Sequence, residues 1–281
     1  MLSDIIRIEE LRSVEQGILD VFSNICDTND LKYSLAYGTL LGAVRHHGFI
    51  PWDDDIDVMM PREDYDKLIE IWHSQAPKEY ILDCCFLWND SVNNFVKIRK
   101  DNTTFIPSEA EKRRSFHKGI YIDVFPGDRV AQTYVAKRIQ FLFFSLNLLF
   151  NRGHGSGKKG AIGLVEKMLL YAVPKGSQKA VSDFFGRKSR QWNWDKDAPI
   201  VFPCTIECCR HYYPSNLFLN LQKIGFEGKT YFAVRDYDTA LRIEYGDYMR
   251  LPPLEERVWK HHPILIDFEH NYEDLVEKGT T

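Results

Sequence analysis

Several features of common protein classes are missing from this sequence, and each absence narrows what the protein can do. The longest strongly apolar stretch, within residues 139–150, has about a dozen residues, whereas a membrane-spanning helix needs ~20. A secretory signal pattern is absent from the N-terminus. The formal net charge of −4 leaves no basic excess, which argues against nucleic acid as the main partner. We therefore expect a cytoplasmic protein that acts, at most, at the inner face of a membrane.

Cysteines are few, and their spacing suits neither a disulfide framework nor a zinc site. The six cysteines include two pairs of sequence neighbours, unlike the spaced framework of a small secreted domain. One cluster contains zinc-type ligands: Cys204, Cys208, Cys209 and His211. It lacks the two separated ligand pairs of a structural zinc site. We therefore expect a reduced protein without zinc at this cluster.

Two common ligand-binding loops are also absent. The glycine-rich segment 153–160 has no glycine followed by four residues and then Gly-Lys-Ser/Thr, as a P-loop requires. An EF-hand beginning at Asp53 would place Val58 where that loop needs glycine and Asp64 where it needs glutamate. The acidic segment that begins at Asp53 therefore needs another explanation.

That acidic segment is the most informative part of the chain. Four aspartates occupy positions 53, 54, 55 and 57, directly before an apolar run, and their mutual repulsion is costly unless a cation binds. If residues 56–60 form a strand, Asp55 and Asp57 project from one face while Ile56 points into the core. Paired carboxylates suit Mg²⁺, with Mn²⁺ as the other candidate. The alternative is a solvated acidic loop.

The segment before the acids could bind phosphate. Gly38 and Thr39 lie between an expected strand and an expected short helix, so a phosphate could approach the backbone and the Thr39 hydroxyl. Arg45 follows, and a guanidinium can bind two phosphate oxygens. A salt bridge from Arg45 to one of the clustered aspartates is an equally good interpretation.

Two later strands carry charged residues in apolar surroundings. Lys97 and Arg99 share one face of a strand expected at residues 95–99, where they could neutralise a diphosphate or face solvent. In the strand expected at residues 119–126, Asp123 lies opposite an apolar face. Burying this acid would be costly without a cation or a donor, so we predict a third carboxylate of the metal site. Pairing with a core arginine, or a backbone cap, is the alternative.

Apolar periodicity gives the remaining elements. Three-and-four spacing predicts helices, and alternation predicts strands, over these ranges: helices at 5–26, 62–72 and 235–245, strands at 31–37 and 80–82. The apolar and aromatic residues from 134 to 150, with a second patch at 168–173 and lysines and arginines nearby, allow two interpretations. They form either a buried pair of helices or a surface that lies on an anionic membrane.

Four stretches of the sequence resemble the LicD family of bacterial phosphocholine transferases, to which fukutin-like proteins are related. They are Tyr-Gly-Thr-Leu-Leu-Gly-Ala-Val-Arg with Gly-Phe-Ile-Pro-Trp-Asp-Asp-Asp-Ile-Asp-Val, then Phe-Val-Lys-Ile-Arg-Lys-Asp-Asn-Thr-Thr-Phe, then Gly-Ile-Tyr-Ile-Asp-Val-Phe-Pro, and Tyr-Gly-Asp-Tyr-Met-Arg-Leu-Pro-Pro. The glycine-threonine turn, the Asp-x-Asp pair and the later third acid also resemble the nucleotidyltransferase-fold signature. The resemblance implies that Lys97 and Arg99 bind phosphate.

The expected fold is α+β, with a nucleotidyltransferase-type mixed β-sheet core, flanking helices and a mainly helical second half. The core would carry Asp55, Asp57 and Asp123 on adjacent strands. We expect residues 1–130 to form the catalytic core and residues 131–281 to form a helical, aromatic-rich part that faces the acceptor or membrane. The two parts could also pack as one domain.

The resemblance implies Mg-dependent transfer of a phospho-alcohol group from a CDP-alcohol to a hydroxyl of a glycan or lipid-linked glycan, with release of CMP. Phosphocholine is the first candidate for the transferred group. In this scheme Asp55 and Asp57 bind the metal, and Asp123 shares it or accepts the acceptor's proton. The phosphates would contact five residues: Gly38, Thr39, Arg45, Lys97 and Arg99. The alternatives are a nucleotidyltransferase that moves a nucleoside monophosphate from a nucleoside triphosphate, and a non-catalytic protein that binds metal and membrane.

Overall fold

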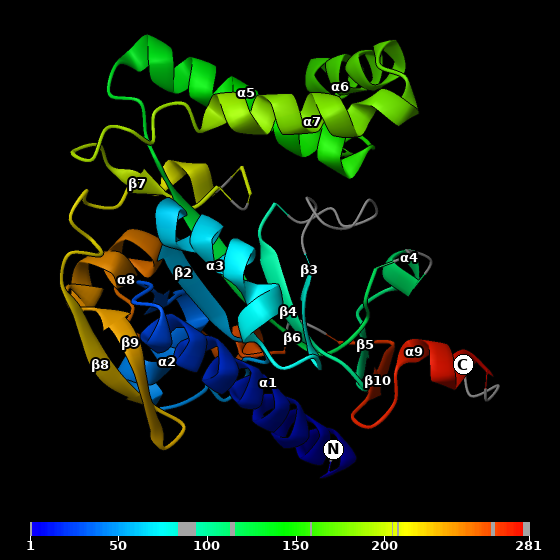
Figure 1. Cartoon of the computed structure of the whole chain (residues 1–281), viewed down its shortest axis with the longest axis vertical. Coiled ribbons are helices and arrows are strands. Elements are labelled where there is room, and N and C mark those ends of the chain that lie inside the picture. The colour runs from blue at the N-terminus through cyan, green and yellow to red at the C-terminus, as the bar shows by residue number, and fades with distance from the viewer. Residues whose placement is uncertain are drawn as a thin grey trace. The chain divides into compact units, whose positions relative to one another are not determined.

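The computed structural model describes residues 2–83, 94–112, 116–157, 159–203, 205–206, 208–259 and 262–277 (Figure 1). The chain divides into two compact units. Unit 1 comprises Met1–Asp83, Val96–Pro126 and Phe218–Thr281, and unit 2 comprises Cys84–Phe95 and Gly127–Leu217. Helices and a β-sheet occur together, so the expected α+β class is confirmed.

Unit 1 begins with a long helix, α1 (Leu2–Thr28), where the apolar spacing predicts one. Ile18, Leu19 and Phe22 on its inner face are fully buried, which fixes that face against the core. The short strand β1 (Ser34–Leu35) and helix α2 (Tyr37–His46) follow. α2 ends where His47 takes the left-handed conformation at φ 61°, so the chain turns towards the acidic segment.

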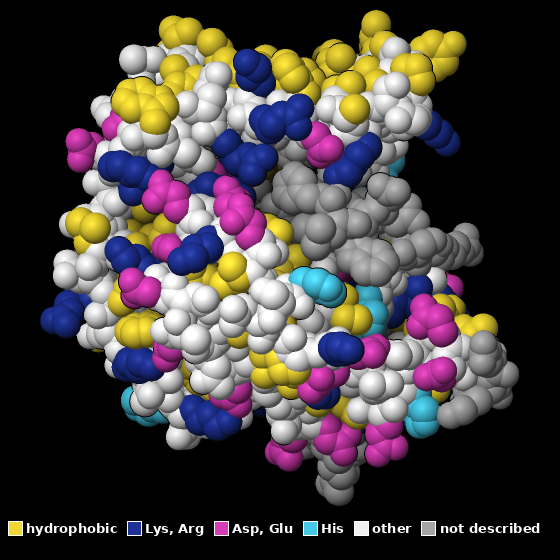
Figure 2. Space-filling model, in the orientation of Figure 1, with side chains coloured by type: hydrophobic (Ala, Val, Ile, Leu, Met, Phe, Trp, Pro, Cys, Tyr) yellow, Lys and Arg dark blue, Asp and Glu magenta, His cyan; other side chains and the backbone are white. Residues whose placement is uncertain are grey.

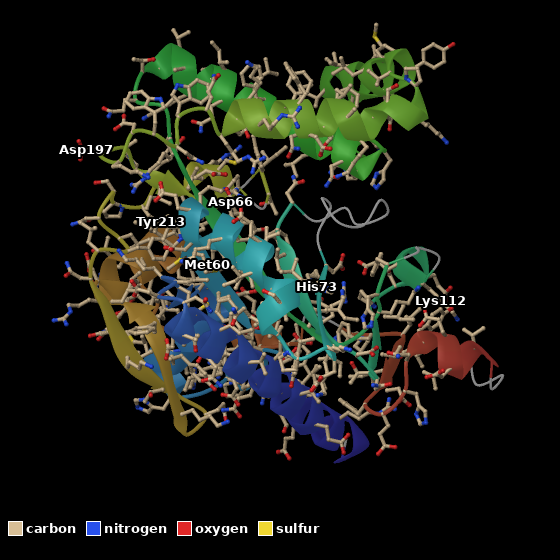
Figure 3. All side chains as sticks on the ribbon, in the orientation of Figure 1. Met60, Asp66, His73, Lys112, Asp197 and Tyr213 are labelled. Carbon is tan, nitrogen blue, oxygen red and sulfur yellow. The ribbon has the colours of Figure 1, made fainter. Side chains whose placement is uncertain are left out.

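A β-sheet forms the centre of unit 1, with strand order β1-β2-β6-β4-β3. Its longer strands are β2 (Asp57–Pro61), β3 (Tyr80–Asp83), β4 (Val96–Lys100) and β6 (Tyr121–Arg129). β4 pairs antiparallel with both β3 and β6. Helices α1 and α3 (Arg62–Gln75) contact this sheet (Figure 1). Met60 of β2 is buried, whereas Asp66 and His73 of α3 are exposed (Figure 3).

The last part of the chain also belongs to unit 1, which differs from the expected division at residue 130. A hairpin of β8 (Leu221–Phe226) and β9 (Lys229–Val234) contacts β1, and the amide of Val234 donates to Ser34 Oγ at 2.9 Å. Helix α8 (Tyr237–Tyr245) contacts α2. These contacts join the two ends of the sequence within unit 1.

Smaller elements complete unit 1. β10 (Leu265–Asp267) pairs antiparallel with β5 (Thr104–Ile106), which brings residues near the C-terminus beside the middle of the chain. The other short elements are α4 (Glu109–Lys112), the 3-10 helix η2 (Leu254–Glu256) and α9 (Tyr272–Glu277). The second half of the chain contains the short strands β7 to β10 besides its helices α5 to α9.

Unit 2 is built on three helices, α5 (Tyr134–Arg152), α6 (Ala161–Ala172) and α7 (Lys175–Ser189). Two buried amides join α5 to α7. Asn147 Nδ2 donates to the Ser182 carbonyl at 2.9 Å, and Gln140 Nε2 donates to the Ser189 carbonyl at 2.9 Å. Because these groups are buried and hydrogen-bonded, they fix the register of the two helices.

The remainder of unit 2 is short and irregular. β7 (Ile200–Val201) pairs with the end of β6, and η1 (Cys208–Arg210) is a single 3-10 turn. Cys204, a member of the cluster at which we do not expect zinc, lies outside the described residues, as does Lys158 of the glycine-rich loop. In the part of the chain that the structure describes, every helix is too short or too polar to cross a bilayer.

Candidate functional site

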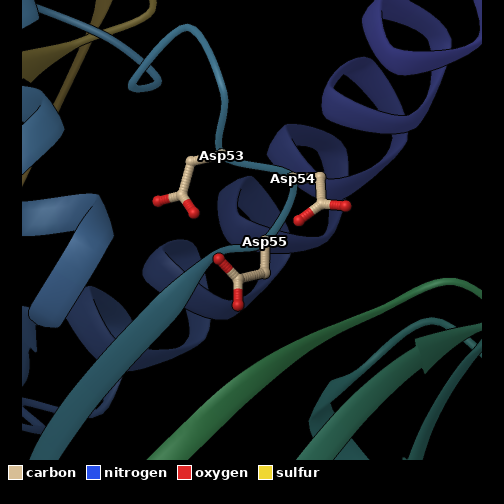
Figure 4. A group of neighbouring side chains, drawn as sticks. All are labelled: Asp53, Asp54 and Asp55. Atoms are coloured by element: carbon tan, nitrogen blue, oxygen red, sulfur yellow. The ribbon is translucent and has the colours of Figure 1, made fainter. Parts of the chain in front are cut away.

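The acidic segment forms a compact group of carboxylates. Asp53 and Asp54 are buried, and Asp55 is half-buried, in the loop that joins α2 to β2. One carboxylate oxygen from each of the three lies within 4.8 Å of the other two (Figure 4). Carboxylates this close repel one another unless a cation or protons lie between them. The group therefore has the composition of a site for an oxygen-preferring cation.

The loop is held by an arginine of α1. Arg12 Nη2 donates to the carbonyls of Ile50 at 2.9 Å and Pro51 at 3.1 Å, and its Nε donates to the Asp53 carbonyl at 3.1 Å. These bonds engage the backbone and leave the aspartate carboxylates for other partners. Arg12 was not predicted from the sequence as part of the site; it holds the loop backbone, and its positive charge also lies close enough to interact with Glu15, Asp53 and Asp54.

Asp57 and Asp123 bring two strands into the group. The structure starts β2 at Asp57, so Asp55 lies in the preceding loop and not on the strand face expected for it. The Asp123 amide donates to the Ile56 carbonyl at 2.9 Å, which places β6 beside the start of β2. Burial raises the pKa of Asp57 well above its usual value, and the negative charges of Asp55 and Asp123 raise it further. Three predicted carboxylates are therefore close enough to influence one another.

Lys97 contacts the acidic group directly. It is opposite Asp123 in the β4–β6 register, and its Nζ donates to both carboxylate oxygens of Asp123, at 2.6 and 2.9 Å. The ammonium also lies 3.5 Å from the centre of the Tyr121 ring. Lys97, predicted to bind phosphate, therefore has Asp123 as its partner in this structure. This pair places one positive charge at the edge of the carboxylate group.

Glu15 is a member of the acidic group that the sequence reasoning missed. Its side chain is 3% exposed, and its Oε2 has no hydrogen-bond partner in the described structure. Burial raises the pKa of Glu15, and Asp55 and Asp54 raise it further. Leaving such an oxygen unpaired is costly, so a cation or a proton is expected beside it. A signal was available, because Glu15 occupies the apolar stripe of α1 between Leu11 and Ile18.

Gly38 and Thr39 lie in the first turn of α2, next to the acids. A Cβ on Gly38 would overlap Asp53 Oδ2, so only glycine lets that carboxylate approach. The Asp57 amide donates to Thr39 Oγ1 at 2.8 Å. Thr39 is 2% exposed and therefore connects the start of α2 to the start of β2. Both residues shape the place where the acids gather.

A cavity of about 870 Å³ opens beside this group in unit 1. Asp53 and Gly38 contribute to its wall, and the other lining residues that matter here are aromatic or basic: Arg45, Trp52, Tyr245, Tyr248 and Arg257. The Arg257 guanidinium lies 5.3 Å from the centre of the Trp52 ring. The segment after α8 thus supplies much of the cavity, although no role of its individual residues could be predicted from the sequence.

The basic residues of this cavity keep donors available. Arg45 Nη1 donates to the Tyr248 carbonyl at 2.7 Å and its Nε to His46 Nε2 at 3.0 Å. These two bonds use part of the five N–H donors of a guanidinium. Arg45 forms no ion pair with the clustered aspartates in the described structure. The alternative interpretation, a salt bridge from Arg45 to one of these aspartates, is therefore wrong. Partial burial raises the pKa of Tyr245, and Asp57 raises it further.

Arg99 has partners in the core. Its side chain is 2% exposed, its Nε donates to Asp83 Oδ2 at 2.8 Å, and its Nη1 donates to the Gly119 carbonyl at 2.9 Å. The guanidinium lies 4.7 Å from the centre of the Tyr121 ring, the same ring that Lys97 contacts, so the two cations share a face as expected. Phosphate binding by Arg99 would require it to leave Asp83.

The donor set fits a divalent cation of the magnesium type. It consists of carboxylates alone, one of which, Glu15, has a buried oxygen without a partner in the described structure. Mg²⁺ and Mn²⁺ prefer oxygen ligands and keep positions for phosphate or water. The ion would be held by the three acids whose oxygens lie together, Asp53, Asp54 and Asp55, while Asp57, Asp123 and Glu15 add negative charge beside them.

The sequence is similar to one protein family and to several known proteins. Residues 30–142 match the family described as LicD/FKTN/FKRP, nucleotidyltransferase domain. The lipopolysaccharide cholinephosphotransferase LicD of Haemophilus influenzae is 28% identical over 259 residues, which covers 90% of this chain and 96% of that protein. An uncharacterized protein of Rickettsia typhi is 42% identical over 64 residues, 21% of each chain. One of Rickettsia prowazekii is 58% identical over 36 residues, 13% of this chain and 14% of that protein.

Proposed function

Since residues 30–142 belong to the LicD family, we propose that the protein transfers a phospho-alcohol group, phosphocholine first, from a CDP-alcohol to a hydroxyl of a cell-surface glycan or its lipid-linked precursor. CMP would be released. The name of the Haemophilus relative supports both phosphocholine as the group transferred and lipopolysaccharide as an acceptor.

The observation that carries this proposal is the position of Asp53. It belongs to the carboxylate group and also to the wall of the 870 Å³ cavity, which is lined by aromatic, basic and aliphatic residues together with two further acids, Asp247 and Glu256. A CDP-alcohol has a diphosphate, which needs cations, and two organic ends, which need apolar or aromatic surfaces. One cavity in unit 1 offers all three kinds of contact.

A bound Mg²⁺ or Mn²⁺ would offset charge on the diphosphate and on the leaving CMP. The residues of the chain have separate tasks in this scheme. Arg45 and Arg257 would bind phosphate oxygens from the cavity wall. Lys97 would hold the Asp123 carboxylate in place, and Asp123 would share the ion or accept the proton of the acceptor hydroxyl.

Phosphocholine is our first choice of transferred group on chemical grounds as well. Its quaternary ammonium cannot donate a hydrogen bond and is recognised by aromatic faces. Trp52, Tyr245 and Tyr248 line the cavity. Ribitol or glycerol would instead need several hydrogen-bonding side chains.

The test incubates the protein with Mg²⁺ and CDP-choline, CDP-ribitol, CDP-glycerol or CTP, with a lipopolysaccharide or glycolipid acceptor, and identifies the released product. The proposal expects CMP from CDP-choline and its loss in Asp57→Asn. Asp66→Asn, an exposed aspartate of α3 in the same unit, is the matched control and should behave as wild type.

Pyrophosphate released from CTP would support nucleotidyl transfer in place of phospho-alcohol transfer. Absence of product from every donor, together with unchanged thermal stability on adding any nucleotide and Mg²⁺, would contradict both activities. It would leave the non-catalytic alternative, in which the carboxylates hold a structural ion. Thermal shift measurements on Asp57→Asn would then report altered stability without any assay signal.

A further inference from the structure

Helix α6 of unit 2 is mainly apolar, and most of its side chains are exposed. Among its residues only Gly163 is buried. Five apolar or aromatic side chains are between 54% and 94% exposed: Ile162, Leu164, Val165, Met168 and Tyr171. A surface helix normally places its apolar residues against a core and its polar residues towards water. The exposure of α6 therefore indicates a partner surface.

The first half of α5 extends the same kind of surface. Phe144, Leu149 and Phe150 in its second half are buried, whereas the first half exposes a stripe of apolar side chains: Tyr134, Val135, Ile139, Phe141 and Leu142. Figure 2 shows hydrophobic side chains gathered along the edge of the view that α5 and α6 occupy in Figure 1. We call these five residues and the five of α6 the apolar face of unit 2.

The charge around this face is positive, although the chain as a whole is acidic. Residues 127–217 contain 14 Lys and Arg but only 6 Asp and Glu, in a chain of formal net charge −4. Arg138, Lys159, Lys167 and Lys175 are exposed on or beside α5 and α6. The basic residues therefore lie where they could meet an anionic surface.

The acid of α6 is held by the neighbouring loop. Glu166 Oε2 accepts from the Ser156 amide at 2.7 Å and from the Ser156 hydroxyl at 2.8 Å. These bonds draw its negative charge towards the loop before α6. The exposed part of the helix is thus left with apolar side chains and Lys167.

We propose that the apolar face of unit 2 docks on the surface of an anionic lipid bilayer, with α6 and the first half of α5 lying in the interfacial region. Apolar side chains would enter the acyl boundary while the flanking cations contact anionic headgroups. A bilayer suits this face because it is laterally uniform, so it can cover a helix most of whose side chains are exposed. A second copy of the chain fits less well, because an isologous contact would bring two basic surfaces together.

This docking is separate from the transfer reaction and can be tested without it. The full chain is mixed with vesicles of phosphatidylcholine alone, or of phosphatidylcholine with phosphatidylglycerol, and bound protein is separated by flotation. We expect flotation with the anionic vesicles and little with the neutral ones. Leu164→Glu combined with Met168→Glu should reduce binding about tenfold or more, since both positions lie on the apolar face.

The matched control is Leu219→Glu in unit 1, at a leucine that is 71% exposed and outside the apolar face. It should float as wild type does. Lys159→Glu with Lys167→Glu should weaken binding to anionic vesicles alone. Circular dichroism of each variant checks that the helices are retained.

Three results would overturn the proposal. The first is wild-type protein that floats with neither kind of vesicle at low salt. The second is equal flotation of the Leu164→Glu, Met168→Glu variant and wild type. The third is a concentration-dependent dimer, seen by light scattering, that the same double substitution dissociates, which would assign the face to a second copy of the chain.

Discussion

Lys97 should stabilise the fold by neutralising part of the carboxylate group. Its Nζ lies 2.6 and 2.9 Å from the two oxygens of Asp123, and both side chains are close to nine-tenths buried. Two unit charges about 3 Å apart attract by about 5 kcal/mol at an effective dielectric constant near 20. Removing one partner of a buried pair costs about 3–5 kcal/mol, because the other charge stays buried. Lys97→Met should therefore lower the melting temperature by about 10 °C.

The assay is thermal unfolding without divalent cations, followed by a repeat with Mg²⁺. Lys100→Met is the control, since Lys100 lies on the same strand and is only half-buried. The double variant Lys97→Met, Asp123→Asn should recover most of the lost stability, because removing both charges leaves no isolated one. Mg²⁺ should stabilise Lys97→Met more than wild type, since the ion then replaces the missing ammonium.

A loss below about 1 kcal/mol for Lys97→Met, with additive effects in the double variant, would refute this reasoning. Lys97 would then act as the phosphate ligand that the family resemblance implies. In that case the substitution would raise the KM for the nucleotide and leave the melting temperature nearly unchanged.

Three further substitutions test the site and its support. Glu15→Gln should be more stable than wild type without divalent cations, and the difference should grow above about pH 5 by up to about 1.4 kcal/mol per pH unit in thermal unfolding. The raised pKa means that Glu15 binds its proton more tightly in the folded protein than in the unfolded chain, so wild-type stability falls as pH rises. Gly38→Ala should weaken Mg²⁺ binding about tenfold or more in a thermal-shift titration, because its Cβ displaces the Asp53 carboxylate. Asp83→Asn should cost about 3–5 kcal/mol in urea unfolding, since it leaves Arg99 buried without its ion pair.

Each has a control at an exposed position. Glu70→Gln, Gly176→Ala and Asp66→Asn should change stability and Mg²⁺ binding little, because nothing buried depends on them. A pH-independent difference for Glu15→Gln would mean that Glu15 has the same pKa when folded and unfolded. Unchanged Mg²⁺ affinity in Gly38→Ala would mean that Asp53 does not bind the metal. A loss of unfolding free energy below about 1 kcal/mol for Asp83→Asn would mean that the Arg99–Asp83 ion pair is solvent-exposed.

The elements that build the centre of unit 1 could be predicted from the sequence because their side chains alternate or repeat regularly. α1, α3 and α8 lie where three-and-four spacing indicates helices, and β2, β4 and β6 lie where apolar alternation indicates strands. The hairpin β8–β9 was not predicted, since buried and exposed residues alternate weakly along its strands. Its packing against β1 depends on contacts between distant parts of the chain, which local periodicity does not encode.

Some residues of the candidate site could likewise be predicted from the sequence, and others could not. Asp57 and Asp123 could be found because each acid interrupts an apolar strand pattern, and the structure puts them close enough to raise the pKa of Asp57. Glu15 interrupts the apolar stripe of α1 in the same manner, but α1 contains several other acids, so this position does not stand out in the sequence. The aromatic and basic walls of the cavity, such as Tyr248 and Arg257, could not be predicted because tertiary folding alone brings them to Asp53.

The contact between Val234 and Ser34 has a consequence for how the protein matures during synthesis. The two residues are 200 positions apart in the sequence. At about 5–20 residues per second, on the order of 10–40 s pass between the emergence of the first and of the second from the ribosome. The acidic loop emerges early in that interval, whereas Tyr245 and Arg257 emerge only after it. A nascent chain could thus bind a metal ion before it has a cavity for any organic substrate, and the ability to hold that substrate would arise only when translation is nearly finished.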